Sequence, residues 1–130
     1  MSDIRFTDLT PPGWERAGGF SPGVRSSGSQ TVHIAGQTGA DAGADFGAQF
    51  EQALGKVVAV MQAAGGTAQN ITMLRYFVTS VDAYLGAGPA LKAAWGQHMG
   101  RHFPASTLVE VTRLLNPQAQ VEIEAEGVLP

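Results

Sequence analysis

The sequence contains no cysteine, so disulfide bonds, thiolate zinc sites and a cysteine nucleophile are excluded. It also has no run of the about 20 apolar residues that a membrane-spanning helix needs. Basic residues are scarce, with 8 Lys and Arg against 11 Asp and Glu, which argues against a nucleic-acid-binding surface. Met1–Arg5 shows no basic region followed by an apolar run, so no signal peptide is predicted. These absences predict a cytoplasmic protein that binds neither membranes nor nucleic acids.

The composition is that of a globular protein. The chain has 130 residues, of which 44% are hydrophobic and 15% charged, enough apolar material for a buried core. No internal repeat and no linker-like segment interrupts it. The sequence therefore predicts a single domain over residues 1–130.

Two segments have the apolar spacing of helices. Asp45–Ala64 carries one apolar stripe at intervals of three and four residues, with Asp41 or Asp45 as a candidate N-cap and Gly65 as its end. Asp82–Met99 is predicted as a second helix with its own stripe, Tyr84, Leu91, Trp95 and Met99. Pro89 fits best near a helix start.

Five segments have the alternation or the β-branched content of strands. An irregular arm, Phe6–Gly19, precedes them. The order strand, strand, helix, strand, helix, strand, strand predicts an α+β fold in which two helices cover one face of a mixed sheet. The first two strands are predicted to form a hairpin, and the last two are predicted as partners joined by the turn 114–120. The five are Phe20–Val24, Thr31–Ala35, Asn70–Thr79, Phe103–Arg113 and Val121–Ala125.

Ordered motifs along the chain resemble those of the reactive intermediate deaminase family (Rid, endoribonuclease L-PSP). They are Phe20-Ser21-Pro22-Gly23-Val24, Ile34-Ala35-Gly36-Gln37, Phe50-Glu51-Gln52-Ala53-Leu54, Met61-Gln62-Ala63-Ala64-Gly65, the run Pro104–Val111 and the run Val121–Ala125. The resemblance implies a chorismate-mutase-like fold and a homotrimer with a central barrel. It also implies clefts between subunits that hydrolyse small enamines or imines, releasing ammonia without a cofactor or metal.

The strands themselves are compatible with assembly. Asn70–Thr79 and Phe103–Arg113 carry apolar side chains on both faces, including Tyr76, Phe77 and Val109. A sheet with helices on one face must cover the other, and closing three sheets into a barrel does so. The alternative is a monomer whose N-terminal arm covers the sheet.

The resemblance also implies the site residues. Glu122 matches the family carboxylate near the catalytic water, and the substrate-binding positions are Phe20, Ala35, Gly36, Gln37, Ser106, Thr107 and Leu108. The family arginine after Pro-Ala, which holds a substrate carboxylate in a bidentate fork, is Ser106 here. Ala35 replaces the serine or threonine that the family usually has before Gly-Gln, and Leu108 is larger than the cysteine or other small residue usual at its position. The predicted site therefore suits a larger, less charged molecule.

Several roles stay open. In an apolar cleft Glu122 would have a raised pKa and act as an acid or base. The alternative is that Glu122 is a solvated residue of an alternating strand. Glu124, on the same face, is predicted to be solvent-exposed. Glu110 is read as structural, paired with Arg113. Arg75 and Arg25 are candidates to replace the missing arginine.

The three histidines carry weaker predictions. His98 and His102 stand four residues apart, but no third ligand is close in sequence and Gly100 lies between them, which disfavours zinc. His33 is read as a core or barrel residue. Three function classes remain: an enamine or imine hydrolase, a non-catalytic small-molecule binder that uses the same cleft and, last because of the acidic charge, a nuclease.

Overall fold

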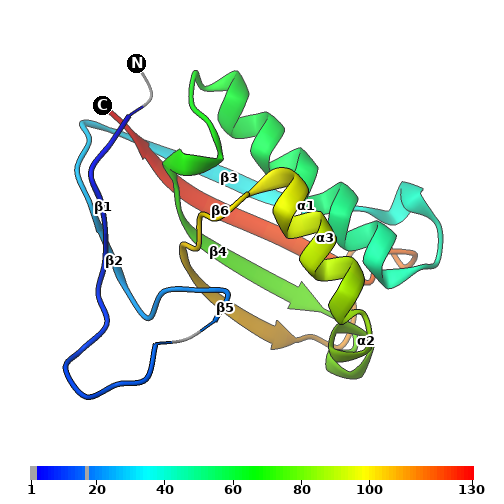
Figure 1. Cartoon of the computed structure of the whole chain (residues 1–130). Helices are drawn as coiled ribbons and strands as arrows, with labels where there is room; N and C mark the ends of the chain where they lie inside the picture. The colour runs from blue at the N-terminus through cyan, green and yellow to red at the C-terminus, as the bar shows by residue number, and fades with distance from the viewer. Residues whose placement is uncertain (1–2, 17) are drawn as a thin grey trace.

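The computed structural model describes residues 3–16 and 18–130, and it forms one four-stranded sheet with helices on a single face (Figure 1). The strand order is β3 (Gln30–Thr38), β6 (Val121–Leu129), β4 (Ile71–Val78), β5 (Ala105–Glu110). β6 is antiparallel to both neighbours, whereas β4 and β5 are parallel. The predicted α+β architecture with a mixed sheet is confirmed. No helix in the described ranges is long and apolar enough to cross a membrane.

The helix α1 (Phe46–Ala63) forms most of the core against the sheet. The side chain of Asp45 caps its first turn by accepting a hydrogen bond from the Ala48 N–H at 2.9 Å. Its apolar stripe is fully buried, with Leu54, Val57 and Met61 at 0% exposure. The prediction for Asp45–Ala64 is therefore confirmed to within two residues. Two single-turn 3₁₀ helices, η1 (Ala40–Ala42) and η2 (Ala68–Asn70), lead into α1 and β4.

The predicted helix Asp82–Met99 is two helices, α2 (Val81–Gly86) and α3 (Gly88–His98), which meet at Ala87. Ser80 caps α2, and Pro89 occupies the first turn of α3. Proline lacks an N–H and its ring collides with the carbonyl four residues earlier, so a helix can restart at Pro89 but cannot continue through it. The single continuous helix was a wrong prediction.

The predicted N-terminal hairpin is also wrong. β2 (Val24–Ser26) pairs with β1 (Phe6–Asp8), inside the segment predicted to be irregular, while β3 pairs with β6. That predicted arm also includes Ala17, which lies outside the described residues. Together β1 and β2 form a two-stranded arm that extends from the sheet (Figure 1).

The last two strands were predicted to be partners, and this prediction is wrong. β4 lies between β5 and β6, so the two are not hydrogen-bonded to each other. In register, Phe77 of β4 stands opposite Val109 of β5 on one side and Glu122 of β6 on the other. β5 ends at Glu110, three residues earlier than predicted, and the Glu110 carboxylate accepts a hydrogen bond from the Val81 N–H at 2.9 Å. Glu110 is structural as expected, but its partner is the start of α2 and no ion pair with Arg113 occurs among the described residues.

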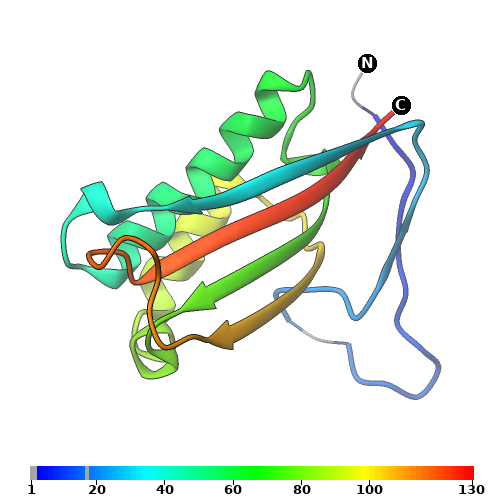
Figure 2. The same ribbon diagram turned by 180° about the vertical axis from the view of Figure 1, so that it is seen from behind.

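The alternation of β6 separates the two faces of the sheet. Val121, Ile123 and Ala125 are buried under the helices, and Glu122, Glu124 and Glu126 point the other way. No helix or strand formed by residues 3–16 and 18–130 crosses this second face, which we call the open face (Figure 2). Apolar residues lie on it too, since Val109 is 42% exposed.

His102 ties the segment before β5 to the core. It is 6% exposed, and its Nε2 lies 2.7 Å from the carbonyl oxygen of Ile71. Its ring packs at 4.5 Å between centroids on Phe6 of β1. Burial lowers the pKa of His102, and the hydrogen bond to Ile71 opposes that effect only in part.

This histidine predicts a pH-dependent stability. The unfolded chain binds a proton near pH 6.5, above the folded pKa, so acidification favours unfolding. The free energy of unfolding should fall as pH drops below about 6.5, by at most about 1.4 kcal/mol per pH unit for one such group. Urea titrations at pH 7.5 and 5.5 measure the change in the free energy of unfolding. His102→Gln, which keeps a hydrogen-bond donor but does not titrate, should make this change smaller, whereas the substitution His33→Gln at an exposed position should leave it as in the wild type. An equal change in all three proteins would contradict this role of His102.

Candidate functional site

The predicted site residues lie at two opposite edges of the sheet. Ser106, Thr107 and Leu108 are on β5, one edge strand, and Ala35–Gln37 is on β3, the other. With two strands between them and a spacing of about 4.8 Å per strand, the edges are roughly 14 Å apart. One chain therefore does not bring the predicted residues together.

At the β5 edge, alternation divides the three predicted residues between the faces. Ser106 and Leu108 stand in register with Leu74 and Tyr76, which are buried under the helices. Thr107 pairs with Arg75 and so lies on the open face. Ser106 and Leu108 are thus the β5 positions that share the helix side of the sheet.

Phe20 reaches the same edge because its neighbour Ser21 is anchored there. The Ser21 hydroxyl donates to the Phe103 carbonyl at 2.7 Å, and the Ser21 N–H donates to the Pro104 carbonyl at 3.2 Å. Ser21 is 3% exposed and bridges to Ala105 at the start of β5. The Phe-Ser motif therefore has a structural reason: the serine fixes the segment, and the phenylalanine is held beside Ser106.

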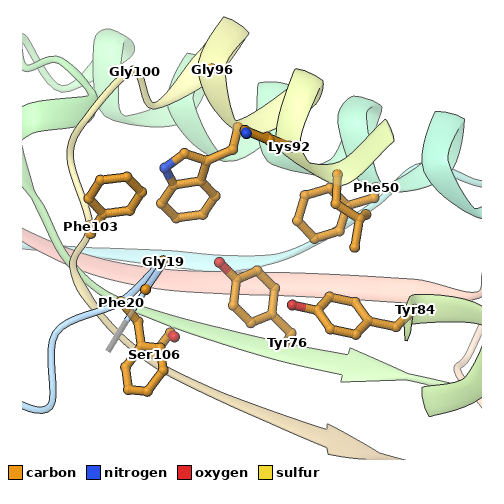
Figure 3. A pocket seen from close by; sticks show the side chains of 13 residues that line it. Gly19, Phe20, Phe50, Tyr76, Tyr84, Lys92, Gly96, Gly100, Phe103 and Ser106 are labelled. Carbon is orange, nitrogen blue, oxygen red and sulfur yellow. The ribbon is translucent and has the colours of Figure 1, made fainter. Parts of the chain in front are cut away.

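A cavity of about 630 Å³ opens at this edge, on the helix side of the sheet (Figure 3). Its walls come from β4, β5, the helices and the segment around Phe20. Aromatic rings dominate the lining, and Ser106 is its member on β5. The lining residues are Gly18, Gly19, Phe20, Phe50, Tyr76, Tyr84, Leu91, Lys92, Trp95, Gly96, Gly100, Phe103 and Ser106.

Ring packing holds the cavity walls in place. Phe50 stacks on Tyr76 at 5.8 Å between centroids, and Trp95 stacks on Phe103 at 5.8 Å with the planes 2° apart. Burial, and to a smaller extent Tyr84 nearby, raises the pKa of Tyr76 far above its ordinary value. The Tyr76 hydroxyl therefore stays protonated and is a hydrogen-bond donor at any physiological pH.

The residues around Glu122 form the second group. The pairing of β3 with β6 shifts register between Ile34 and Gln37, so Ala35 and Gly36 form a bulge. The Glu122 carboxylate lies against Gly36, and a Cβ atom at Gly36 would overlap it. The Gln37 amide donates to the Ala35 carbonyl at 3.1 Å. Four predicted residues therefore do meet, on the open face near the β3 edge.

Glu122 differs from the two other glutamates on its face. Arg75 contacts Glu126 at 2.6 Å and Glu124 at 3.6 Å. Glu122 has no ion pair or hydrogen bond to a side chain elsewhere in the described ranges. Arg75 is thus held by carboxylates on the open face, away from Ser106, and Arg25 lies exposed on β2 opposite Thr7. Neither stands beside Ser106 in one chain.

The histidines have separate environments. His98 on α3 contacts Glu51 on α1 at 3.3 Å, and His102 is in the core. His33 is exposed on β3, which excludes the core alternative and leaves the barrel alternative a prediction. Among residues 3–16 and 18–130, no three His, Asp or Glu side chains gather as a metal site would require. The sequence did not predict most of the cavity wall, including Tyr84, Lys92 and Phe103, and it favoured core packing for Trp95. The spacing of Tyr84 and Trp95 places each on the inward face of a helix. That spacing does not distinguish a residue packed in a core from one that lines a cavity.

Comparisons with known proteins agree with this architecture. The family model for endoribonuclease L-PSP matches residues 13–128. A Yersinia pestis protein of the conserved Rid family is 29% identical with a TM-score of 0.81, covering 95% of this chain and 98% of its own. A YjgF-family member from Mycobacterium tuberculosis is 31% identical with a TM-score of 0.66, covering 96% and 100%. The YjgF gene product of E. coli is 29% identical with a TM-score of 0.68, covering 85% and 88%. The search of curated proteins finds no match.

These matches extend over nearly the whole chain, and the sheet order and helix placement fit the chorismate-mutase-like fold that the sequence motifs predicted. The family model alone covers far more than half of the sequence. The chain therefore belongs to the endoribonuclease L-PSP family, also known as the Rid or YjgF family.

Proposed function

We propose that this protein is a homotrimeric hydrolase of a small enamine or imine, with Glu122 as its acid–base group in a cleft between copies. The observation that carries the proposal is the free carboxylate of Glu122. Arg75 forms ion pairs with Glu124 and Glu126 but not with Glu122, whose carboxylate lies beside the bulge at Gly36. A carboxylate without an internal partner is available to a water molecule and a substrate.

A second copy of the chain supports the proposal geometrically. Ser106 and Phe20 are at the β5 edge, and Glu122 and Gly36 are near the β3 edge. A head-to-tail interface places one edge of a subunit against the opposite edge of the next, and three such contacts close a ring. Each cleft would then combine both groups. The same ring would cover the apolar residues of the open face.

The reaction needs only water as co-reactant. Water adds to the C=N carbon of an imine, the C–N bond breaks, and the products are a ketone and ammonia. An enamine first takes a proton on carbon to become the imine. Glu122 accepts a proton from the attacking water and returns it to the leaving nitrogen. This scheme uses no cofactor or metal, and we place the reaction in the cytoplasm.

A non-catalytic binder is the second candidate, and one observation favours it. The cavity beside Ser106 has no carboxylate, and no arginine, among its described lining residues. A ligand held only there would meet aromatic rings and hydroxyl groups without an acid–base catalyst. The net charge of −3 leaves nuclease activity as the weakest of the three candidates.

The assembly can be tested by a charge on the open face. Wild-type protein should sediment at about three times 13.5 kDa at micromolar concentration. Val109→Glu places a carboxylate on the open face beside the β5 edge and should shift the mass toward the monomer, because burying an unpaired charge is costly. Val60→Glu, an equally exposed valine on the outer side of α1, should leave the mass unchanged. A monomeric wild-type protein would contradict the proposed cleft.

The catalytic role can be tested by removing one titratable proton. Glu122→Gln should lower kcat for imine hydrolysis by about 10²–10⁴ fold, the usual contribution of general acid–base assistance, while the mass stays trimeric. Glu124→Gln, on the same strand and face, should change kcat by less than about tenfold. The assay follows ammonia release from imino acids generated in situ by an amino-acid oxidase. If Glu122→Gln keeps full turnover, Glu122 is not the catalytic group; if no imine is hydrolysed above the uncatalysed rate, the binder is the better description.

A further inference from the structure

The cavity beside Ser106 concentrates the aromatic residues of the chain. Six of the ten aromatic residues line it, each from a different helix, strand or connecting segment, namely Phe20, Phe50, Tyr76, Tyr84, Trp95 and Phe103. Its volume of about 630 Å³ is within the range of small-molecule sites. Aromatic walls favour flat ligands, because offset-stacked and edge-to-face contacts add to the burial of apolar surface.

The cavity also contains a hydrogen-bond donor that the protein does not use. Tyr76 is 7% exposed, and its hydroxyl makes no hydrogen bond to another described residue. Figure 3 shows this hydroxyl pointing into the cavity, with the Tyr84 hydroxyl directed toward Tyr76. The hydroxyl oxygen is accessible from the cavity, so an acceptor atom on a ligand there can receive its hydrogen bond.

One positive charge stands at the rim. Lys92 on α3 is exposed and is the only charged side chain among the described residues of the lining. With no carboxylate beside it in the cavity, Lys92 attracts an anion. A lysine supplies a point charge without the fixed fork of an arginine, so it favours negative charge without fixing its orientation.

From these features we infer that the cavity binds a planar aromatic ring whose attached acidic group lies toward Lys92 and the tyrosine hydroxyls. This deepens the proposed function, on which it rests for the reaction, because Ser106 and Phe20 belong to both the cavity and the cleft. The substrates would then be imino or enamino acids with an aromatic side chain. The ring would fill the cavity, and the C=N carbon, which is bonded to the carboxylate carbon in such an acid, would lie directly beside the acidic group.

Binding of a non-reacting probe tests the cavity separately from catalysis. The probe is 3-phenylpropanoate, compared with hexanoate, which lacks the ring, and 3-phenylpropanamide, which lacks the charge. Calorimetric titration of the full chain should show 3-phenylpropanoate binding at least about tenfold tighter than hexanoate and measurably tighter than the amide. Equal affinity for 3-phenylpropanoate and hexanoate, or no binding of either, would overturn the inference.

Variants locate the probe. Gly96 lines the cavity, and a Cβ atom there meets nothing within 4 Å, so Gly96→Leu fills the space. It should abolish binding, whereas Gln97→Leu, the next position on α3 and outside the lining, should not. Tyr76→Phe removes one hydroxyl and should weaken binding by about three- to tenfold. This smaller change remains informative if Gly96→Leu fails to fold. Binding that is unchanged in both Gly96→Leu and Tyr76→Phe would place the probe elsewhere.

Fluorescence gives an independent reading of the location. The chain has two tryptophans, and Trp14 is 63% exposed on the arm, so Trp14→Phe leaves Trp95 of the cavity wall as the sole reporter. Titration of this variant with 3-phenylpropanoate should change its emission saturably, with the calorimetric affinity. An unchanged emission at saturation would contradict a ring beside Trp95.

Probe binding and imine hydrolysis, measured side by side on the wild-type protein, separate this inference from the proposed function. If the probe binds but no imine is hydrolysed, the cavity assignment holds and the proposed hydrolase fails. If imines are hydrolysed but the probe does not bind, the hydrolase holds and the aromatic cavity assignment fails.

Discussion

The packing of α1 against one face of the sheet is the interaction on which the rest of the structure depends. Leu54, Val57 and Met61 bury completely against strand residues such as Leu74 and Ile123. Each fully buried side chain of this size contributes about 1.5–3 kcal/mol from removal of apolar surface from water. Because strand residues alternate, fixing Ile123 in this core also fixes Glu122 on the opposite face. The position of the candidate acid–base group thus follows from the core.

A second consequence of the one-sided core is that the two groups of candidate site residues lie at or near opposite edges of the sheet. The segment around Ser21 attaches to the start of β5, which completes the aromatic cavity on the helix side. The bulge in β3 lies at the other edge and receives the Glu122 carboxylate. Neither feature needs the other for its own geometry. Their combination into one site belongs to the assembly that we propose.

The sequence predicted those elements whose period is strong and uninterrupted. α1 and the alternation of β6 needed only local spacing, and both were found in the structure. The hairpin at Phe20–Val24 was wrong because strand pairing is a long-range choice: β3 obtains a longer ladder with β6 than a short hairpin could offer. The cavity could not be foreseen, since Tyr84 and Trp95 have the spacing of a core stripe. Only the folded chain, in which residues of α3 and β5 line the same cavity, shows that the space between them is not filled.

The bulge residue Gly36 illustrates how exposure can mislead in a mutational scan. An exposed residue at a sheet edge is ordinarily among the most tolerant positions of a protein, and the backbone at Gly36 does not require a positive φ angle. Yet any larger residue would push aside the carboxylate end of Glu122, a flexible side chain, and leave the backbone in place. Substitutions there would pass a screen for folding and, under the proposed role of Glu122, fail one for activity. Tolerance at this position is therefore set by the neighbouring side chain rather than by burial.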